Sequence, residues 1–502
     1  MASPRKDRQE GFRGGLNLVA DESQLGREDL RRADNARLTE TGGVTKRGGT
    51  RRIHSAAVAA AVLRGGYEWA RASGRQLLVV CNGQLHTGTY GLPMTWAAQT
   101  GALDAGARPQ FATFRDAGAE VCYIADGGLL NKWNGAAVSV NLAGTPNVKL
   151  LATHNLRLFG AGDPSNPDTL YYSTLSNGDT LGIAASGGGA AAVRTYGARE
   201  ITALIPVGTS LLIFHEAAIS RFTGWSQDDI EIQSGTRGVS DDVGTIAPGT
   251  ILGVEGLGYF LSDRSFYRVT EAGVEAVGQK IEPVLQSLDQ SIVLRAQAAH
   301  HRAFREILVY LPDVGVFVFN YRTGGWTGPW TSLLGTAVLH TLFPAHDATR
   351  NNIVLAGGSD GFVRLLDAPT IYKDDVLSDG TGGTRFAFAA QLRRLFFGTD
   401  DDEKSLRFIH LVANLRGSQS AQVQFRTALE QGASPIQAMT SGAQWGSFEW
   451  GSFEWGAGGE SLTHTVDAWG RGRFVDITLA DDAEAPVLFS RVQADAFSLG
   501  RR

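Results

Sequence analysis

The chain has 502 residues, a length that exceeds one hydrophobic core and therefore predicts two or three domains. Its net charge of −5 argues against a general nucleic-acid-binding protein, which is normally strongly basic, although an acidic or neutral surface still lets DNA slide past. The 63 glycines and a charged fraction of only 19% favour many short strands joined by tight turns.

The first segment, 1–54, has few aromatic residues and more Lys and Arg than Asp and Glu. Such a segment buries too little apolar surface to fold alone. We therefore expect an extended N-terminal arm that lies on the domain following it or reaches a neighbouring subunit; a solvated leader is the alternative. The first twelve residues are rich in charged side chains and lack an apolar core, so the sequence does not predict a signal peptide there. The aliphatic stretch Ala56–Leu63 is too short to span a membrane.

A repeated unit fills the segment 55–370: a β-rich run, a turn with Asx or Gly, and a second β-rich run. The turns fall near positions 82, 126, 216, 263, 313 and 360, a spacing of about 40–50 residues that is typical of four-stranded propeller blades. The interval from 126 to 216 is double, so we expect a blade with a weaker pattern around Leu156–Ser173. One blade cannot bury both of its faces, whereas blades stacked around an axis do. The pattern predicts a β-propeller, with the number of blades left open.

Two features interrupt the repeats. The segment 280–288 has a helical pattern, and Asp289 after it is a suitable N-cap for a second short helical turn. Trp326 and Trp330 lie in a Gly-rich and Pro-containing stretch. We expect these tryptophans to pack between blades, with an exposed contact surface as the alternative.

The chain has only two cysteines, Cys81 and Cys122, and both lie in predicted strands. We interpret them as buried free thiols, since a buried cysteine behaves as a small hydrophobic residue. A disulfide between neighbouring blades is the alternative. Neither a disulfide framework nor a zinc site is indicated.

The polar, Gly-rich segment 371–384 predicts a linker, and the alternating strands after it predict a C-terminal β-sandwich over 385–502. The expected strands are Arg385–Phe397, Ser405–Leu415, Ala421–Leu429, Arg473–Leu479 and Val487–Phe497. A tandem Trp-Gly-Ser-Phe-Glu repeat lies inside this domain. Its aromatic residues predict an exposed docking loop, and they are Trp445, Phe448, Trp450, Phe453 and Trp455.

The order of several short motifs is similar to that of a known family. These motifs are GVTKR at 43–47, NGQLHTG at 82–88, IEPVLQS at 281–287, EILVYLP at 306–312 and VFVFN at 316–320. From about residue 40 to 370, this layout resembles the packaged-DNA stabilisation proteins that form the tail nozzle of short-tailed bacteriophages. The Trp-Gly-Ser-Phe-Glu repeat departs from the family's pattern, which leaves the distal partner open.

The resemblance implies a structural protein of the virion tail, assembled in the host cytoplasm. Such proteins form rings, usually of six copies, below the portal and adaptor proteins. They continue the DNA channel, retain the packaged genome, and carry a tail needle, fibre or spike at the far end. In this setting we expect Lys46, Arg47, Arg51 and Arg52 to contact a partner or the DNA backbone, because cationic side chains pair with carboxylates or phosphates. Solvated turn residues are the alternative.

The sequence contains no motif that indicates catalysis, a cofactor or a metal. The histidines lack metal-ligand spacing, and Gly187-Gly188-Gly189 is not followed by the Lys-Ser/Thr of a phosphate-binding loop. Carboxylate pairs such as Asp241-Asp242 are more typical of solvated turns than of a glycosidase. The alternative function is a tail receptor protein that binds or cleaves host glycans, with the aromatic repeat as a stacking surface. A third possible function is that of a bacterial scaffold protein whose propeller is of prophage origin.

Overall fold

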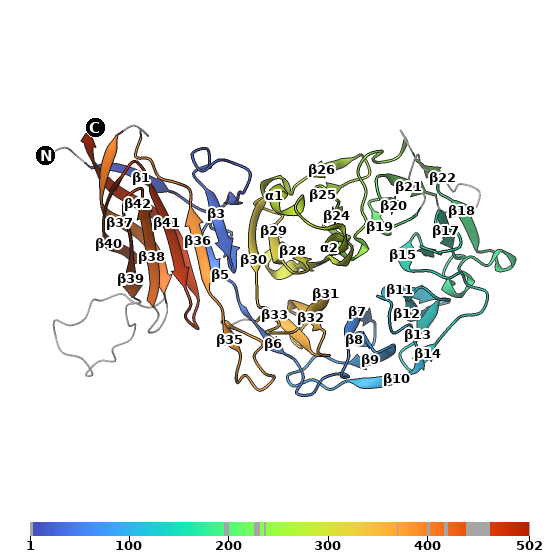
Figure 1. The fold of residues 1–502 in the computed structure, drawn as a ribbon. Helices are drawn as coiled ribbons and strands as arrows, with labels where there is room; N and C mark the ends of the chain where they lie inside the picture. Colours follow the sequence, from blue (N-terminus) through green and yellow to red (C-terminus); the bar gives the residue numbers. More distant parts are fainter. Residues whose placement is uncertain are drawn as a thin grey trace.

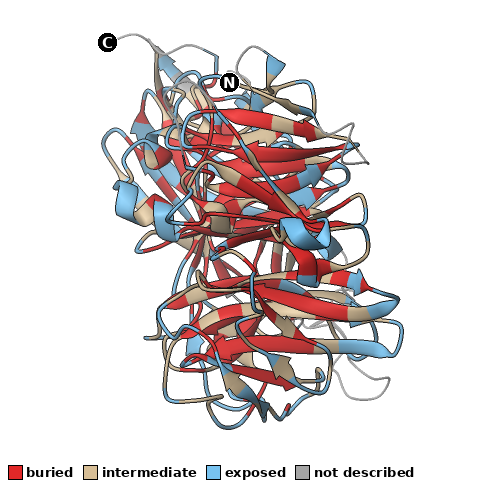
Figure 2. Ribbon diagram, turned by 90° about the vertical axis from the view of Figure 1, so that its right-hand side faces the viewer, coloured by how far each residue is buried: buried red, intermediate tan, exposed pale blue. Residues whose placement is uncertain are grey.

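The computed structural model describes residues 4–194, 200–224, 231–234, 237–368, 370–398, 402–415, 420–437 and 462–500. Two β-rich bodies lie next to each other, a ring of blades and a layered sandwich, and the first and the last strand of the described chain both lie in the sandwich (Figure 1). Buried residues occupy the strands of both bodies, and the exposed residues gather in the turns (Figure 2). The predicted all-β class and the β-propeller are confirmed.

The described residues form seven blades of four antiparallel strands each. The first three blades are, in order, β7 (Leu63–Arg71), β8 (Gly74–Cys81), β9 (Gln84–Gly88) and β10 (Ala97–Ala102); β11 (Gln110–Asp116), β12 (Ala119–Ala125), β13 (Asn131–Trp133) and β14 (Val138–Ser139); and β15 (Leu150–His154), β16 (Arg157–Ala161), β17 (Thr169–Tyr172) and β18 (Gly189–Ala192). The fourth and fifth blades are β19 (Ala203–Val207), β20 (Ser210–Phe214), β21 (Ile219–Thr223) and β22 (Glu231–Gln233); and β23 (Leu252–Val254), β24 (Leu257–Leu261), β25 (Phe266–Val269) and β26 (Val274–Ala276). The sixth and seventh blades are β27 (Gln297–His301), β28 (Glu306–Leu311), β29 (Gly315–Asn320) and β30 (Gly325–Trp330); and β31 (Leu339–His346), β32 (Asn352–Gly358) and β33 (Val363–Ala368) with β6 (Gly49–Arg52).

The first strand of each blade lines the axis, and β31 of the last blade packs against β7 of the first. The weakly patterned blade expected around Leu156–Ser173 is present as β15–β18. The turn at Asn82-Gly83 has positive φ angles of 51° and 70°, as a tight hairpin turn between right-twisted strands requires. Aromatic side chains fill the space between blades; Phe214 and Phe260, for example, meet edge to face with ring centroids 4.9 Å apart.

The two tryptophans of the Gly-rich stretch are buried, so the packing interpretation is confirmed. The indole of Trp326 donates to the carbonyl of Val277 and that of Trp330 to the carbonyl of Ala36, each over 2.8 Å. The helical segment is confirmed in short form, as α1 (Glu282–Leu285) and α2 (Gln290–Arg295). The carboxylate of Asp289 accepts a hydrogen bond from the amide of Ser291 and caps α2.

Cys81 and Cys122 are free and buried, which confirms their interpretation as thiols within strands. Burial raises the pKa of both thiols, most strongly for Cys122. Neither thiol is therefore activated as a nucleophile at neutral pH.

The sandwich consists of two sheets that combine C-terminal strands with strands of the arm. The first sheet contains β1 (Arg5–Gln9), β4 (Ala36–Leu38), β5 (Val44–Lys46), β37 (Glu403–Leu415), β40 (Leu462–Gly472) and β42 (Val487–Gly500). The second contains β2 (Gly15–Leu16), β3 (Asp29–Asp34), β36 (Phe388–Leu392), β38 (Ser420–Thr427), β39 (Gln431–Gln437) and β41 (Val475–Asp481). A two-stranded ribbon, β34 (Lys373–Asp374) with β35 (Thr384–Arg385), precedes them.

The second sheet continues into the propeller without a break. β2 and β3 lie between β30 of the sixth blade and β36, which gives one ten-stranded sheet. One hydrophobic core also spans both bodies, from Phe319 of the sixth blade to Phe388 and Phe489 of the sandwich. The propeller and the sandwich therefore share a core, which opposes hinge motion between them.

The expected division into an arm, a propeller, a linker and a sandwich needs correction at two places. The segment 1–54 supplies strands to both sandwich sheets and to the last blade, so it is neither a separate arm nor a solvated leader. The segment 371–384 is not a free linker, because β34 lies within it and the backbone of Val376 pairs with Arg52 and Thr50.

Candidate functional site: the closure of the propeller

The ring of blades is closed by a strand from the N-terminal segment. β6 pairs antiparallel with β33, which brings Arg52 opposite Arg364 and Arg51 opposite Leu365. The last blade thus takes three strands from the end of the propeller and its fourth from the beginning of the chain. Full closure leaves the ring without an open side, and the outermost edge of this blade is covered by the segment that follows it.

Arg47 anchors the closure in the interior of the protein. Its side chain is completely buried, and its guanidinium bonds to both carboxylate oxygens of Asp374 over 2.6 and 2.8 Å. The same guanidinium donates to the side chain of Asn35 over 2.9 Å and lies 3.7 Å from the ring centroid of Phe386. Burial raises the pKa of Asp374, and the charge of Arg47 opposes this change. Arg47 therefore connects the N-terminal segment, which also contains Asn35, to Asp374 and to Phe386 at one buried point.

Lys46 makes a second buried ion pair, on the sandwich side. Its ammonium group lies 3.0 Å from the carboxylate of Asp481 and donates to the carbonyl of Ala483 over 2.6 Å. Burial lowers the pKa of Lys46, and Asp481 opposes this change. Because both charges are removed from water, each one depends on the other.

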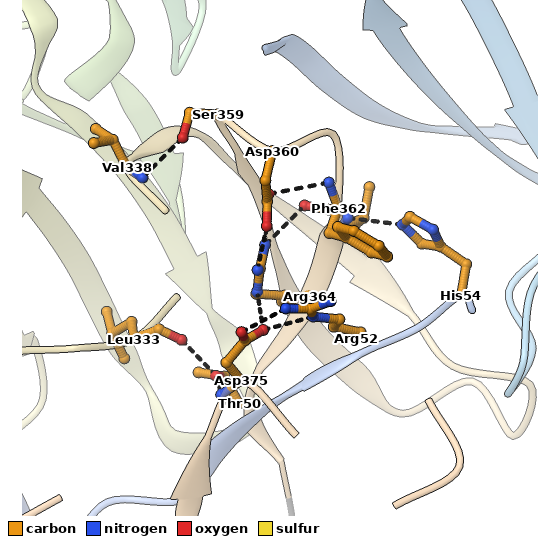
Figure 3. Close-up of polar contacts among 11 residues, drawn as sticks. Thr50, Arg52, His54, Leu333, Val338, Ser359, Asp360, Phe362, Arg364 and Asp375 are labelled. Atoms are coloured by element: carbon orange, nitrogen blue, oxygen red, sulfur yellow. Dashed lines mark hydrogen bonds and ion pairs between the residues drawn. The ribbon is translucent and has the colours of Figure 1, made fainter. Parts of the chain in front are cut away.

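Arg52 and Arg364 share the carboxylate of Asp375 (Figure 3). Arg52 bonds to both oxygens of Asp375 over 2.6 and 2.7 Å, while Arg364 bonds to one over 2.7 Å and to Asp360 over 2.6 Å. The hydroxyl of Thr50 accepts from the amide of Asp375 and donates to the carbonyl of Leu333. Burial acts to raise the pKa of Asp375, but the hydrogen bonds from the two arginines outweigh it and hold the pKa below its usual range.

Replacing Asp375 by Asn tests this shared carboxylate. Because its folded pKa lies below the ordinary value of 3.8, its contribution to stability is complete above about pH 4 and is lost as the pH falls through the folded value. We expect the variant to be about 1–3 kcal/mol less stable at pH 7. Its stability should also fall less steeply below about pH 4, as measured by urea unfolding. The matched control is D241N at an exposed turn; equal acid slopes for D375N and the unsubstituted chain would contradict the assignment.

Arg37 holds a further cluster that the sequence did not indicate. Its guanidinium bonds to Glu306 over 3.0 Å and to Asp367 over 2.5 Å, and it lies 3.8 Å from the ring centroid of Phe304. Burial raises the pKa of Glu306 to about 7, and it lowers that of the neighbouring His301 to about 4. These partners come from the sixth and seventh blades, so Arg37 links both blades to the N-terminal segment.

The predicted contact residues need correction. Lys46 and Arg47 are buried and ion-paired within the chain, so they do not face a partner or DNA. Arg52 is mostly buried against Asp375, and Arg51 donates to the carbonyl of Ser378 over 2.5 Å. Charged side chains are almost never fully buried unless they are paired. The four cations are together, as expected, but they bind their own chain.

The predicted docking loop cannot be placed. Trp445, Phe448, Trp450, Phe453 and Trp455 lie outside the described residues.

In the part of the chain that the structure describes, no three His, Cys, Asp or Glu side chains are grouped as metal ligands. No helix within those same ranges is long and apolar enough to cross a membrane.

Searches of family models and of curated proteins find no match to this chain. Among solved structures, the chain is similar to the extracellular domain of a hybrid two-component system from B. thetaiotaomicron, with 10% identity and a TM-score of 0.42. The match covers 64% of this chain and 39% of that chain. It is also similar to the WD40 domain of Neurospora crassa Pan2, with 7% identity and a TM-score of 0.42; this match covers 66% of this chain and 97% of that chain. A further similar structure is the N-terminal domain of Nup159, with 9% identity and a TM-score of 0.37, where the match covers 67% of this chain and 98% of that chain.

Proposed function

We propose that this chain is a structural protein of the virion, a subunit of the tail nozzle of a short-tailed bacteriophage. The observation that best supports this role is the joining of propeller and sandwich into one body by a shared core and a continuous ten-stranded sheet. A subunit that retains a pressurised genome must transmit force without bending at a domain boundary. The motif order from about residue 40 to 370 supports the same role.

In this role several copies, six in the family that the chain resembles, form a closed ring below the portal and adaptor. A ring requires a heterologous contact, in which one face of each subunit meets a different face of the next. The genome passes through the lumen, and a needle, fibre or spike is attached at the distal end. The net charge of −5 suits a lumen that does not retain DNA by phosphate binding.

Disruption of the gene tests this role. We expect particles with full-sized heads that package DNA and then lose it, and with shortened tails, because the channel below the portal is missing. Electron microscopy and protection of DNA from added nuclease give the two readouts, and a plasmid copy of the gene is the control that restores both.

The glycan-binding or glycan-cleaving receptor is the alternative function. If disruption of the gene gives stable, DNA-filled particles that have complete channels but do not adsorb to the host, the nozzle role is wrong and the receptor role takes its place. The alternative also predicts that the isolated chain binds a host oligosaccharide and that Trp450→Ala weakens this binding.

A further inference from the structure

A cavity of about 790 Å³ lies on the axis of the propeller. It is lined by residues at or just before the innermost strands: Arg64 in β7, Arg108 before β11, Leu150 in β15, Arg295 before β27, and Thr341 in β31. Its volume lies within the range of about 300–1,000 Å³ that is typical of sites for small molecules. The cavity is separate from the closure of the ring, since none of the residues that bond across the closure, Arg47, Arg52, Arg364, Asp374 and Asp375, lines the cavity.

Three arginines gather at one side of this cavity. Arg108 donates to the backbone carbonyl of His340 over 3.2 Å, which holds it at the seventh blade. Among the described residues, Arg64 has no hydrogen bond or ion pair for its guanidinium. Arg295 is half exposed and bonds to Asp313 over 3.3 Å and to the carbonyl of Ser291. Two of the three cations are thus not neutralised by a carboxylate of the described chain.

The titration of neighbouring groups agrees with an electropositive site. Burial lowers the pKa of Arg108, and the charges of Arg64 and Arg295 lower it further. Burial also lowers the pKa of His340, and the same three arginines add to this effect. A charge on the imidazole would add to the three positive charges already there, so the histidine remains neutral at pH 7.

The carboxylates that line the cavity lie elsewhere on its rim. Glu200 and Glu216 belong to the blade of β19–β22, which lies across the ring from β7 and β31 (Figure 1). Neither side chain has a hydrogen bond or ion pair among the described residues. Asp126 also lines the cavity, but its carboxylate accepts from the amides of Asp104 and Gly128. Lys149 adds a fourth cation, next to β15.

We propose that the axial cavity binds a small, hydroxylated organic ligand that carries a carboxylate or phosphate group. Arg64 and Arg108 hold the anionic group, with Arg295 at the rim, because guanidinium groups bond to both anions in bidentate fashion. Glu200 and Glu216 accept hydrogen bonds from hydroxyl groups at the other end of the ligand. This inference goes beyond the nozzle role and does not depend on it.

Calorimetric titration of the full chain with four probes tests the proposal. Glucuronate and glucose 6-phosphate carry both features, glucose lacks the anion, and inorganic phosphate lacks the hydroxyls. We expect at least one of the first two to bind about tenfold or more tightly than glucose and than phosphate. The comparison of glucuronate with glucose 6-phosphate shows whether the preferred anion is a carboxylate or a phosphate. Equal or absent binding of all four probes would overturn the proposal.

Substitutions locate the site. R64Q and R108Q are expected to weaken binding of the better probe about tenfold, and R64K less, because lysine keeps the charge but not the planar fork. The matched control is R115Q, since Arg115 lies near the other end of β11 and does not line the cavity. Circular dichroism checks that each variant is folded. Unchanged binding in R64Q would overturn the assignment, as would an equal loss in R115Q.

Discussion

Replacing Arg47 by Met is expected to destabilise the protein by about 3–5 kcal/mol. The substitution leaves the carboxylate of Asp374 buried without its partner, and an unpaired buried charge is far more costly than a lost surface ion pair. It also removes the hydrogen bond to Asn35 and the contact with Phe386. Urea or thermal unfolding of the isolated chain measures the change.

Two variants make this result specific. R27M changes an exposed arginine of the same N-terminal segment and should alter the free energy of unfolding by no more than about 0.5 kcal/mol. The double variant R47M/D374N should cost less than the sum of its two single substitutions, because neither charge of this ion pair is left buried without its partner. An R47M protein as stable as the unsubstituted chain would show that the ion pair does not hold the closure.

Deletion of residues 1–54 is expected to abolish cooperative folding. The deletion removes the fourth strand of the last blade and five strands from the sandwich sheets. It also leaves Glu306, Asp367, Asp374 and Asp481 without their buried cationic partners. Soluble yield, near-ultraviolet circular dichroism and the sharpness of thermal unfolding report the loss.

Supplying the missing segment separately is the control for this deletion. Co-expression of residues 1–54 as an independent polypeptide should restore part of the soluble yield, because its strands pair with edges that remain in the truncated chain. A truncated protein that unfolds cooperatively within a few degrees of the complete chain would mean that the segment is an accessory arm after all.

The blades could be predicted because each hairpin is a local pattern of strand residues and turn residues. The third blade, β15–β18, was also expected, although its pattern is the weakest of the seven. The connection between Tyr172 and Gly189 contains two short 3-10 turns, at Gly178–Thr180 and Ala184–Ser186, and it lengthens the spacing between turns. The pattern still indicated the correct place, although it left the number of blades open.

The candidate site was predicted in position but not in role. The sequence showed a group of cations at 46–52, and the family resemblance suggested that they contact external partners. Their true partners lie far along the chain, since Arg47 and Asp374 are 327 positions apart. The acidic pair Asp374-Asp375 in the expected linker was the one signal that matched these cations in charge.

Strand periodicity, turn chemistry and the placement of the two cysteines within strands followed from the sequence, because they depend on residues that are close together in the chain. The sharing of β6 with the last blade, the passage of β2 and β3 between the two bodies, and the burial of Lys46 and Arg47 depend on contacts between distant segments. A short polar strand such as Gly49–Arg52 has no apolar pattern of its own, and it becomes a strand only where β33 offers an unpaired edge. For the same reason the arginines of the axial cavity, on separate blades, meet only in the closed ring.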